Sequence, residues 1–261
     1  MHEPRSYDGY IFDLDGTVYL GDRLIPGAAE VVMTLRNSAS RVMFVTNKPI
    51  DTRENYASKL HTLGIPTGPE EVMTSPWALA HYIEANHESP RCFVLGEEPV
   101  IEPLEAVGCT IVTEADNTDI VVVSWDRNLT YAKFDEAFQA LRQGAKYYVT
   151  NPDVTCPVPG GEVSDAGANI AGLTACSKRE PDLIAGKPRP TLAHAAMEQM
   201  GTDPSNTILV GDRLQTDMQC GRNAGCDTAL VLTGVSSRDD LRDLPDDERP
   251  TCTIESVRDL I

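Results

Sequence analysis

The chain has 261 residues, of which 41% are hydrophobic, and a formal charge of −18 at pH 7. That length allows one large domain or two modest ones. The acidic charge argues against the nucleic-acid backbone as a partner, and no apolar stretch approaches the roughly 20 residues that a membrane span needs.

Strand and helix patterns alternate from the N-terminus onward, which indicates α/β architecture. The first apolar run, Tyr10-Ile11-Phe12, predicts a buried strand that leads into Asp13. A second apolar strand, 41–45, leads into Thr46-Asn47-Lys48. The other elements expected in this first series are helices at 27–37, 52–63 and 76–85 and a short strand at 72–74.

A second series of the same kind begins near Arg91. Its expected strands are 92–95, 110–112, 120–124 and 147–150, and its expected helices are 100–107, 131–143 and 168–176. A loop rich in Pro and Gly is expected at 151–165. The first series then resumes near Lys187, with a helix at 191–200, a strand at 207–210 and a solvated helix and loop in the acidic cluster 238–249.

Two aspartates one residue apart, Asp13 and Asp15, follow the first strand, and Gly16 comes next. In an extended segment the side chains at i and i+2 point the same way, so the two carboxylates are expected to face one small volume. Such a pair can divide the work of nucleophile or metal ligand and of general acid and base. The alternative is a strand end followed by an ordinary Asx-type turn.

Other polar side chains follow later strands in a consistent order. Thr46 and Asn47 end the second strand, and Gly211-Asp212 and Asp217 follow the strand at 207–210. Lys187 lies in a chain that has only six lysines. Each signal alone is weak, but carboxylates, a hydroxyl and a lysine at the carboxyl ends of strands lie at the edge where α/β sheets form their sites.

Seven scattered cysteines without a Cys-x-x-Cys pair are expected to be reduced thiols of a cytoplasmic protein. The charged residues include six lysines but sixteen arginines. A surface rich in acids and poor in lysine suits solubility in concentrated salt, where self-repulsion is screened. The sequence therefore suggests a halophilic source as a hypothesis, and an ordinary acidic enzyme is the alternative.

The motifs together resemble those of the haloacid dehalogenase (HAD) superfamily, class IIA, the subgroup of NagD-like and 4-nitrophenylphosphatase-like phosphatases. The superfamily's Asp-x-Asp-Gly-Thr motif is matched by residues 13–17, its Ser/Thr by Thr46 and its lysine by Lys187. The acidic motif Gly-Asp-x-x-x-x-Asp is matched by residues 211–217. Thr150-Asn151-Pro152-Asp153 and Leu232-Thr233-Gly234 are typical of the subgroup, and the resemblance covers nearly the whole chain.

The resemblance implies a Rossmann-like core, a doubly wound parallel sheet, with an inserted α/β cap domain of the C2 type. The core would consist of residues 1–84 and 180–261, and the cap of residues 85–179. The implied enzyme is a Mg²⁺-dependent phosphatase that hydrolyses small phosphate monoesters through an aspartyl-phosphate. We allow for a homo-oligomer and expect no nucleic-acid or membrane partner.

The matched positions carry expected roles. Asp13 would be the nucleophile, and Asp15 the general acid and base. Mg²⁺ would be held by Asp13, the main-chain carbonyl of Asp15, and Asp212. Asp217 would orient Lys187 or a metal-bound water, or would be a helix N-terminal charge stabilised by the dipole. The residues expected to bind phosphate or the rest of the substrate are Leu14, Thr46, Asn47, Lys187, Asn151 and Asp153.

The substrate stays open among glycerol phosphates, sugar phosphates and nucleoside monophosphates. Many subgroup members carry a Pro-Gly-Ala-Gly-like run where this chain has Ser164-Asp165-Ala166-Gly167-Ala168, so no single member's substrate is transferred. Trp125 can stack on a ring of the substrate or simply pack. The alternative functions are a phosphomutase that uses the same aspartyl-phosphate, a metal-independent dehalogenase and a non-catalytic binding protein.

Overall fold

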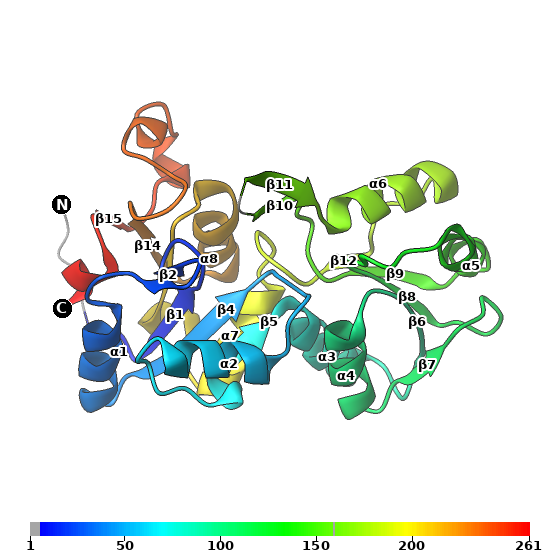
Figure 1. Cartoon of the computed structure of the whole chain (residues 1–261), viewed down its shortest axis with the longest axis horizontal. Coiled ribbons are helices and arrows are strands. Elements are labelled where there is room, and N and C mark those ends of the chain that lie inside the picture. Colours follow the sequence, from blue (N-terminus) through cyan, green and yellow to red (C-terminus); the bar gives the residue numbers. More distant parts are fainter. Residues whose placement is uncertain (1–5, 159) are drawn as a thin grey trace. The chain divides into compact units, whose positions relative to one another are not determined.

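The structure, a computed structural model, describes residues 6–158 and 160–261 (Figure 1). The chain forms two compact units. The core unit contains the residues up to Thr46, Arg53–Met73 and Lys187–Ile261, and the inserted unit contains Asn47–Thr52 and Thr74–Gly186. Within the described ranges, every helix is too short or too polar to span a bilayer.

The core unit is built on one six-stranded sheet in the order β15-β14-β13-β1-β4-β5. Strand β1 lies inside the sheet and pairs in parallel with both β4 and β13. The sheet order therefore reverses direction beside β1, as in a doubly wound fold. The strands are β1 (Gly9–Asp13), β4 (Arg41–Thr46), β5 (Val72–Thr74), β13 (Thr207–Gly211), β14 (Asp227–Val231) and β15 (Cys252–Ile254).

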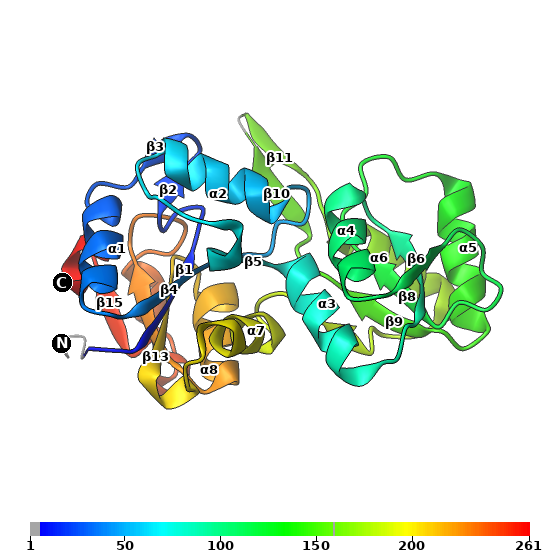
Figure 2. The ribbon, with the colours of Figure 1, turned by 90° about the horizontal axis from the view of Figure 1, so that it is seen from below.

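Helices cover both faces of this sheet (Figure 2). Alternate strand residues such as Phe12, Phe44 and Val210 pack with Val31 and Leu35 of α1 in one buried cluster. The helices are α1 (Ala28–Asn37), α2 (Arg53–Thr62), α7 (Thr191–Met200) and α8 (Gln219–Ala224). The smaller elements are β2 (Tyr19–Leu20), β3 (Arg23–Leu24), η1 (Pro69–Glu71), η2 (Pro204–Asn206), η3 (Leu214–Met218) and η6 (Val257–Leu260).

The inserted unit has its own five-stranded sheet in the order β12-β9-β8-β6-β7. Its paired strands are parallel, and alternating side chains feed two separate buried clusters, so both faces are covered. The strands are β6 (Arg91–Leu95), β7 (Thr110–Val112), β8 (Ile120–Val123), β9 (Lys146–Val149) and β12 (Leu183–Ile184). The helices are α3 (Ser75–Asn86), α4 (Glu98–Ala106), α5 (Tyr131–Arg142) and α6 (Ala166–Ser177).

The stretch expected to be a loop at 151–165 contains a β-hairpin, so that expectation is wrong for its central part. Strands β10 (Thr155–Val158) and β11 (Gly161–Ser164) pair antiparallel. Most of their residues are exposed, and the Pro and Gly residues of this stretch are the reason that the sequence indicated a loop. Pro157 is tolerated because a two-stranded ribbon has free edges.

The division between the units lies elsewhere than at the expected 85–179. The inserted unit takes Thr74–Gly186 and, in addition, the short stretch Asn47–Thr52. Helix α3 belongs to the inserted unit because Leu79 and Ile83 pack in the cluster beneath that unit's sheet. Strand β12 belongs there because it pairs with β9.

The acidic cluster 238–249 contains two short 3₁₀ turns, η4 (Asp239–Leu241) and η5 (Asp246–Glu248), whose residues are largely exposed. This agrees with the expectation of a solvated segment, although neither turn is an α-helix. All seven cysteines are free thiols, and five of them are buried.

Candidate active site

Three strands of the core sheet end side by side, and each delivers predicted site residues. Asp13 is the last residue of β1 and pairs with Val45 of β4. Thr46, the last residue of β4, directly follows Val45. On the other side of β1, strand β13 ends at Gly211, so Asp212 follows it. The parallel register therefore brings Asp13, Thr46 and Asp212 to one edge of the sheet.

Lys187 joins two of the predicted acids in a buried ion-pair network. Its Nζ donates to Oδ1 of Asp13 and, at 2.7 Å, to Oδ1 of Asp217. The side chains of Lys187 and Asp217 are 5% and 1% exposed, so water screens these contacts little. The lysine that the sequence singled out thus meets carboxylates from two distant segments.

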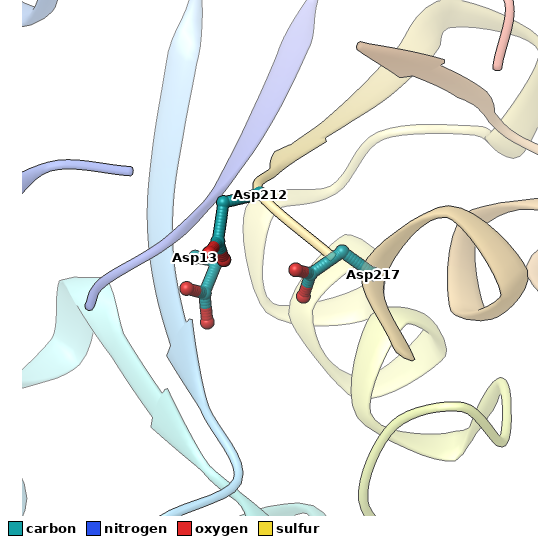
Figure 3. A group of neighbouring side chains, drawn as sticks. All are labelled: Asp13, Asp212 and Asp217. Atoms are coloured by element: carbon teal, nitrogen blue, oxygen red, sulfur yellow. The ribbon is translucent and has the colours of Figure 1, made fainter. Parts of the chain in front are cut away.

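The carboxylates of Asp13, Asp212 and Asp217 are directed toward one another (Figure 3). One oxygen from each lies within 4.8 Å of the others, and all three residues are buried. This arrangement brings three acids to a single lysine, which leaves excess negative charge in a place with little water. Such a cluster favours a bound cation or protonated carboxyls.

The pKa values in the metal-free cluster reflect this cost. Burial raises the pKa of Asp13 to about 8; Lys187 opposes the rise, and the Asp217 and Asp212 charges add to it. Burial, with the Asp217 charge, raises the pKa of Asp212 to about 6. Burial alone would lower the pKa of Lys187, but the charges of Asp13 and Asp217 outweigh it and raise that pKa above its ordinary value.

Asp217 lies on η3, a turn of π-helix directly after Arg213. Such turns occur frequently at functional sites. Oδ2 of Asp217 accepts the N–H of Arg213 at 3.0 Å, while Oδ1 accepts from Lys187. One carboxylate therefore contacts both the main chain at the start of η3 and the ammonium group of Lys187, and its role in orienting Lys187 stays a prediction.

Glycines make room for the Asp212 carboxylate. A Cβ on Gly234 would lie 2.0 Å from Oδ2 of Asp212, and a Cβ on Gly16 would lie 2.6 Å from the same atom. Gly16 also has a φ of 90°, a conformation that residues with a side chain rarely adopt. Both glycines are therefore required by the close approach of the acid.

The two oxygens of Asp212 differ in their partners. Oδ2 accepts the N–H of Val235 at 2.7 Å. Oδ1 is buried and, among the described residues, has no hydrogen-bond partner. A buried acceptor of this kind is costly unless another group satisfies it, and Oδ1 is available to a cation.

Asp15 is placed differently from the expectation. Strand β1 ends at Asp13, so the extended geometry that would align the two carboxylates stops there. Asp15 is exposed, whereas Asp13 is 8% exposed and belongs to the buried cluster. The side chain of Asp15 is not part of the acidic cluster found in the described chain, and its main-chain carbonyl as a ligand stays a prediction.

Leu14 and Thr46 are buried beside Asp13 in the core unit. The carbonyl of Leu14 accepts the N–H groups of Val18 and Tyr19 at 2.9 and 3.2 Å, so a tight turn follows the strand. Within this turn Thr17 is fully buried, and its hydroxyl has no partner among the described residues. Thr17 matched the motif in the sequence, but nothing there indicated an unsatisfied hydroxyl.

The remaining predicted substrate residues lie together in the inserted unit. Asn47 donates from Nδ2 to Oδ2 of Asp153 at 2.9 Å, and Asn151 donates to the same oxygen at 3.1 Å. Asn151 also donates to Oδ1 of Asp165 at 3.0 Å. These four side chains form one polar network. Asp165 was not among the predicted site residues, because nothing in the sequence spacing linked it to the other three.

The inserted unit also contains a cavity of about 350 Å³. It is lined by Trp125, Asp126, Arg127, Val163, Ser164, Asp165, Ala168 and Asn169. The Trp125 ring is 8% exposed and packs with Cys156 and Ala166, while the Arg127 guanidinium lies 5.9 Å from the ring centroid. Packing therefore accounts for most of the surface of Trp125.

Comparison with known proteins identifies the family. Residues 10–110 match the family described as haloacid dehalogenase-like hydrolase, and residues 184–260 match the HAD-hydrolase-like family. The chain is 39% identical to the 5′-nucleotidase YutF of Bacillus subtilis over 98% of both chains. It is 36% identical to an acid sugar phosphatase of Staphylococcus haemolyticus, over 97% of this chain and 95% of that protein.

Solved structures of similar proteins share the whole architecture. The p-nitrophenyl phosphatase of Archaeoglobus fulgidus aligns with a TM-score of 0.91 at 30% identity, over 98% of both chains. NagD of E. coli K-12 aligns with a TM-score of 0.90 at 32% identity, over 98% of this chain and 100% of that one. A glycerol phosphate phosphatase of Mycobacterium tuberculosis, in complex with magnesium, aligns with a TM-score of 0.90 at 32% identity, over 98% and 76%. This chain therefore belongs to the haloacid dehalogenase-like hydrolases and, within them, to the phosphatases that include NagD and the 4-nitrophenylphosphatases.

Proposed function

We propose that this phosphatase hydrolyses small phosphate monoesters with Mg²⁺, through an aspartyl-phosphate formed on Asp13. The observation that carries the proposal is the buried cluster at the end of β1 and β13. It combines a carboxylate held by Lys187, two further acids and a buried oxygen of Asp212 that, in the described chain, has no partner. Such a cluster is costly for stability alone, and a site that binds a cation and a phosphoryl group accounts for it.

Mg²⁺ fits the donor set, because the cluster offers only oxygen ligands and excess negative charge. Asp13, Asp212 and the main-chain carbonyl of Asp15 would hold the ion, with Asp217 beside them. When bound, it supplies positive charge that lessens the repulsion between the nucleophile and the phosphate. The similar glycerol phosphate phosphatase, whose structure is described as a complex with magnesium, supports this choice of metal.

In the first chemical step, an oxygen of Asp13 forms a bond to phosphorus, and the bond from phosphorus to the leaving oxygen breaks. The leaving oxygen keeps the electron pair of that bond and receives a proton from Asp15. In the second step, a water molecule attacks the phosphorus, and Asp15 takes the proton of that water. Asp13 is released as a carboxylate, so the enzyme returns to its starting state.

Lys187 has two functions in this scheme. Its ammonium group holds one oxygen of Asp13 in place, and its charge opposes the rise that burial produces in the pKa of that carboxyl, which favours the ionised, nucleophilic form. The same charge, with the hydroxyl of Thr46 and the N–H groups of Leu14 and Asn47, stabilises the phosphoryl oxygens. Asp217 accepts from Lys187 at 2.7 Å and so fixes the direction in which the ammonium points.

The substrate is a small organic phosphate, and its class stays open between glycerol or sugar phosphates and nucleoside monophosphates. The similar proteins carry different substrate names, among them a 5′-nucleotidase, an acid sugar phosphatase and a dihydroxyacetone phosphatase. We propose Asn151 and Asp153 of the inserted unit as contacts for the organic part. Their shared hydrogen bonds fix them before any ligand binds.

Phosphate release from 4-nitrophenyl phosphate and a panel of glycerol, sugar and nucleoside phosphates tests the proposal. We expect release with Mg²⁺ and none after treatment with EDTA, with activity restored when Mg²⁺ is added back. Release that is equal with and without metal would contradict the proposed cofactor. Release of no phosphate together with transfer between two positions of a sugar phosphate would point to a phosphomutase.

A further inference from the structure

The segment Leu232-Thr233-Gly234, typical of the subgroup in sequence, has no part in the chemistry described above. In the structure it follows β14 and, with Val235 and Ser236, forms a loop that we call the 232–236 loop. This loop contacts two separate parts of the proposed site. One contact is on the side of the acid, Asp15, and the other is on the side of the metal, Asp212.

On the acid side, the hydroxyl of Thr233 donates to the carbonyl oxygen of Gly16 at 2.6 Å. The N–H of Gly16 donates to the carbonyl of Tyr19 at 2.7 Å. Both main-chain polar groups of Gly16 are therefore held, although a glycine with a φ of 90° is otherwise the most permissive point of the turn. Asp15 directly precedes this glycine.

On the metal side, main-chain groups of the same loop hold Asp212. Val235 donates its N–H to Oδ2 at 2.7 Å, and Ser236 donates its N–H to the main-chain carbonyl of Asp212 at 3.0 Å. The hydroxyl of Ser236 accepts the N–H of Leu214 at 3.2 Å. The metal side is thus held by main-chain donors and Ser236, whereas the acid side depends on the hydroxyl of Thr233.

We propose that Thr233 is a positioning residue for the general acid, an inference that rests on the proposed function. Its hydroxyl fixes the Gly16 carbonyl, and this keeps the Asp15 carboxyl at the place where it protonates the leaving oxygen. Asp15 is exposed, so packing does not hold it, and the hydrogen bond to the neighbouring residue supplies the constraint. A misplacement of about 1 Å can lower a rate by about 100-fold, which is why one hydrogen bond matters here.

The position of the acid matters most for a poor leaving group. An alkoxide such as that of glycerol 3-phosphate needs the proton, whereas 4-nitrophenolate leaves without much protonation. We expect Thr233→Val to lower kcat/KM for glycerol 3-phosphate by about 10- to 100-fold and kcat/KM for 4-nitrophenyl phosphate by less than about threefold. We compare kcat/KM because it covers only the steps up to departure of the leaving group, whereas kcat also includes the second step, in which Asp15 acts alike for both esters. Thr233→Ser keeps the hydroxyl and should restore both rates.

The matched control is Ser236→Ala, which removes a hydroxyl from the same loop on the metal side. It should lower the two kcat/KM values by equal factors and raise the Mg²⁺ concentration needed for half-maximal rate. Equal losses on both esters in Thr233→Val, or no rescue by Thr233→Ser, would overturn the assignment of Thr233 to the acid.

A second measurement does not depend on turnover. Hydrogen exchange of the peptide 14–19 in the metal-free protein should become about fivefold faster in Thr233→Val, the effect of losing one typical hydrogen bond, and should be unchanged in Thr233→Ser. Unchanged exchange in Thr233→Val would overturn the proposal. If the wild type hydrolyses neither ester, the proposed function fails, while the exchange rates still decide whether Thr233 holds this turn.

Discussion

Replacing Asp212 with Asn should make the metal-free protein more stable while removing its ability to use Mg²⁺. The Asp212 carboxylate is 1% exposed and lies against Asp13 and Asp217, so its charge is unfavourable until a cation arrives. The single carbonyl oxygen of Asn can still accept the N–H of Val235, and the amide adds a donor where the buried Oδ1, in the described chain, has no partner. The substitution therefore removes a charge without removing the hydrogen bond.

The magnitude follows from the pKa of Asp212, which burial and the Asp217 charge raise from 3.8 to about 6. A shift of about two pKa units corresponds to about 3 kcal/mol. Because the folded pKa lies above the unfolded one, the contribution of Asp212 to stability is lost as the pH rises from about 4 through about 6. Asn does not titrate, so the variant should match the wild type near pH 4 and exceed it by about 3 kcal/mol at pH 8.

Urea unfolding in EDTA at pH 4 and pH 8, repeated with Mg²⁺ at pH 8, measures both halves of the prediction. Mg²⁺ at 100 times its dissociation constant should stabilise the wild type by about 2.7 kcal/mol and should leave Asp212→Asn unchanged. The matched control is Asp243→Asn, which makes the same charge change at an exposed position in the surface segment 238–249, far from Asp212 in the sequence. We expect the wild-type response from that control.

The reasoning fails if Asp212→Asn is less stable than the wild type in EDTA at pH 8. That result would mean that the carboxylate is stabilising in the metal-free fold and that the site is a structural ion-pair network. The reasoning also fails if the variant keeps the same stabilisation by Mg²⁺. A gain in stability combined with the loss of the metal response is the outcome that only a cation site explains.

Three further predictions test the proposed chemistry and the surface. Asp13→Asn should lower kcat by a factor on the order of 10³ or more without a change in the circular dichroism spectrum, and substantial activity in saturating Mg²⁺ would refute the nucleophile. Asp15→Asn should lower kcat/KM for alkyl phosphates by about 10²- to 10⁴-fold and kcat/KM for 4-nitrophenyl phosphate much less, because kcat/KM does not include the second step that both esters share. Equal losses in kcat/KM would mean that Asp15 serves geometry. The acidic, lysine-poor composition predicts activity that is kept or increased in molar KCl, and a rate that is highest in dilute buffer and lost in molar salt would contradict the halophile hypothesis.

The sequence predicted best those helices and strands whose apolar residues are bounded on both sides by turn or capping residues. Strand β5 was expected at 72–74 and has those bounds, and the expected helix at 191–200 is α7. The buried strand that leads into Asp13 was found for the same reason, since its residues form a continuous apolar run with a turn on either side. Asp13 and Asp212 lie at one edge because the strands that lead into them, β1 and β13, are parallel neighbours, whereas Asp217 comes from η3.

Features that depend on long-range contacts were not predicted. The placement of α3 in the inserted unit, for example, depends on which sheet its buried face meets. The β10–β11 hairpin is local but mostly exposed, and its Pro and Gly residues indicated a loop. Strands β14 and β15 were not among the expected elements either. The partners of Asp212 show the same limit, because Val235 holds it through a main-chain N–H, which leaves no signature in the identity of the side chain.

The electrostatics of the cluster explain why stability and function oppose each other at this site. A fold selected for stability alone would replace one of three buried acids, because one lysine cannot compensate all of them. The local structure instead accommodates the arrangement, since Gly16 and Gly234 leave room for the Asp212 carboxylate and the 232–236 loop donates to it. A bound cation would relieve the repulsion among the three carboxylates, so the unfavourable free energy of the metal-free cluster would add to the affinity for the cation. The gain in the free energy of unfolding expected for Asp212→Asn measures the part of that repulsion that Asp212 contributes.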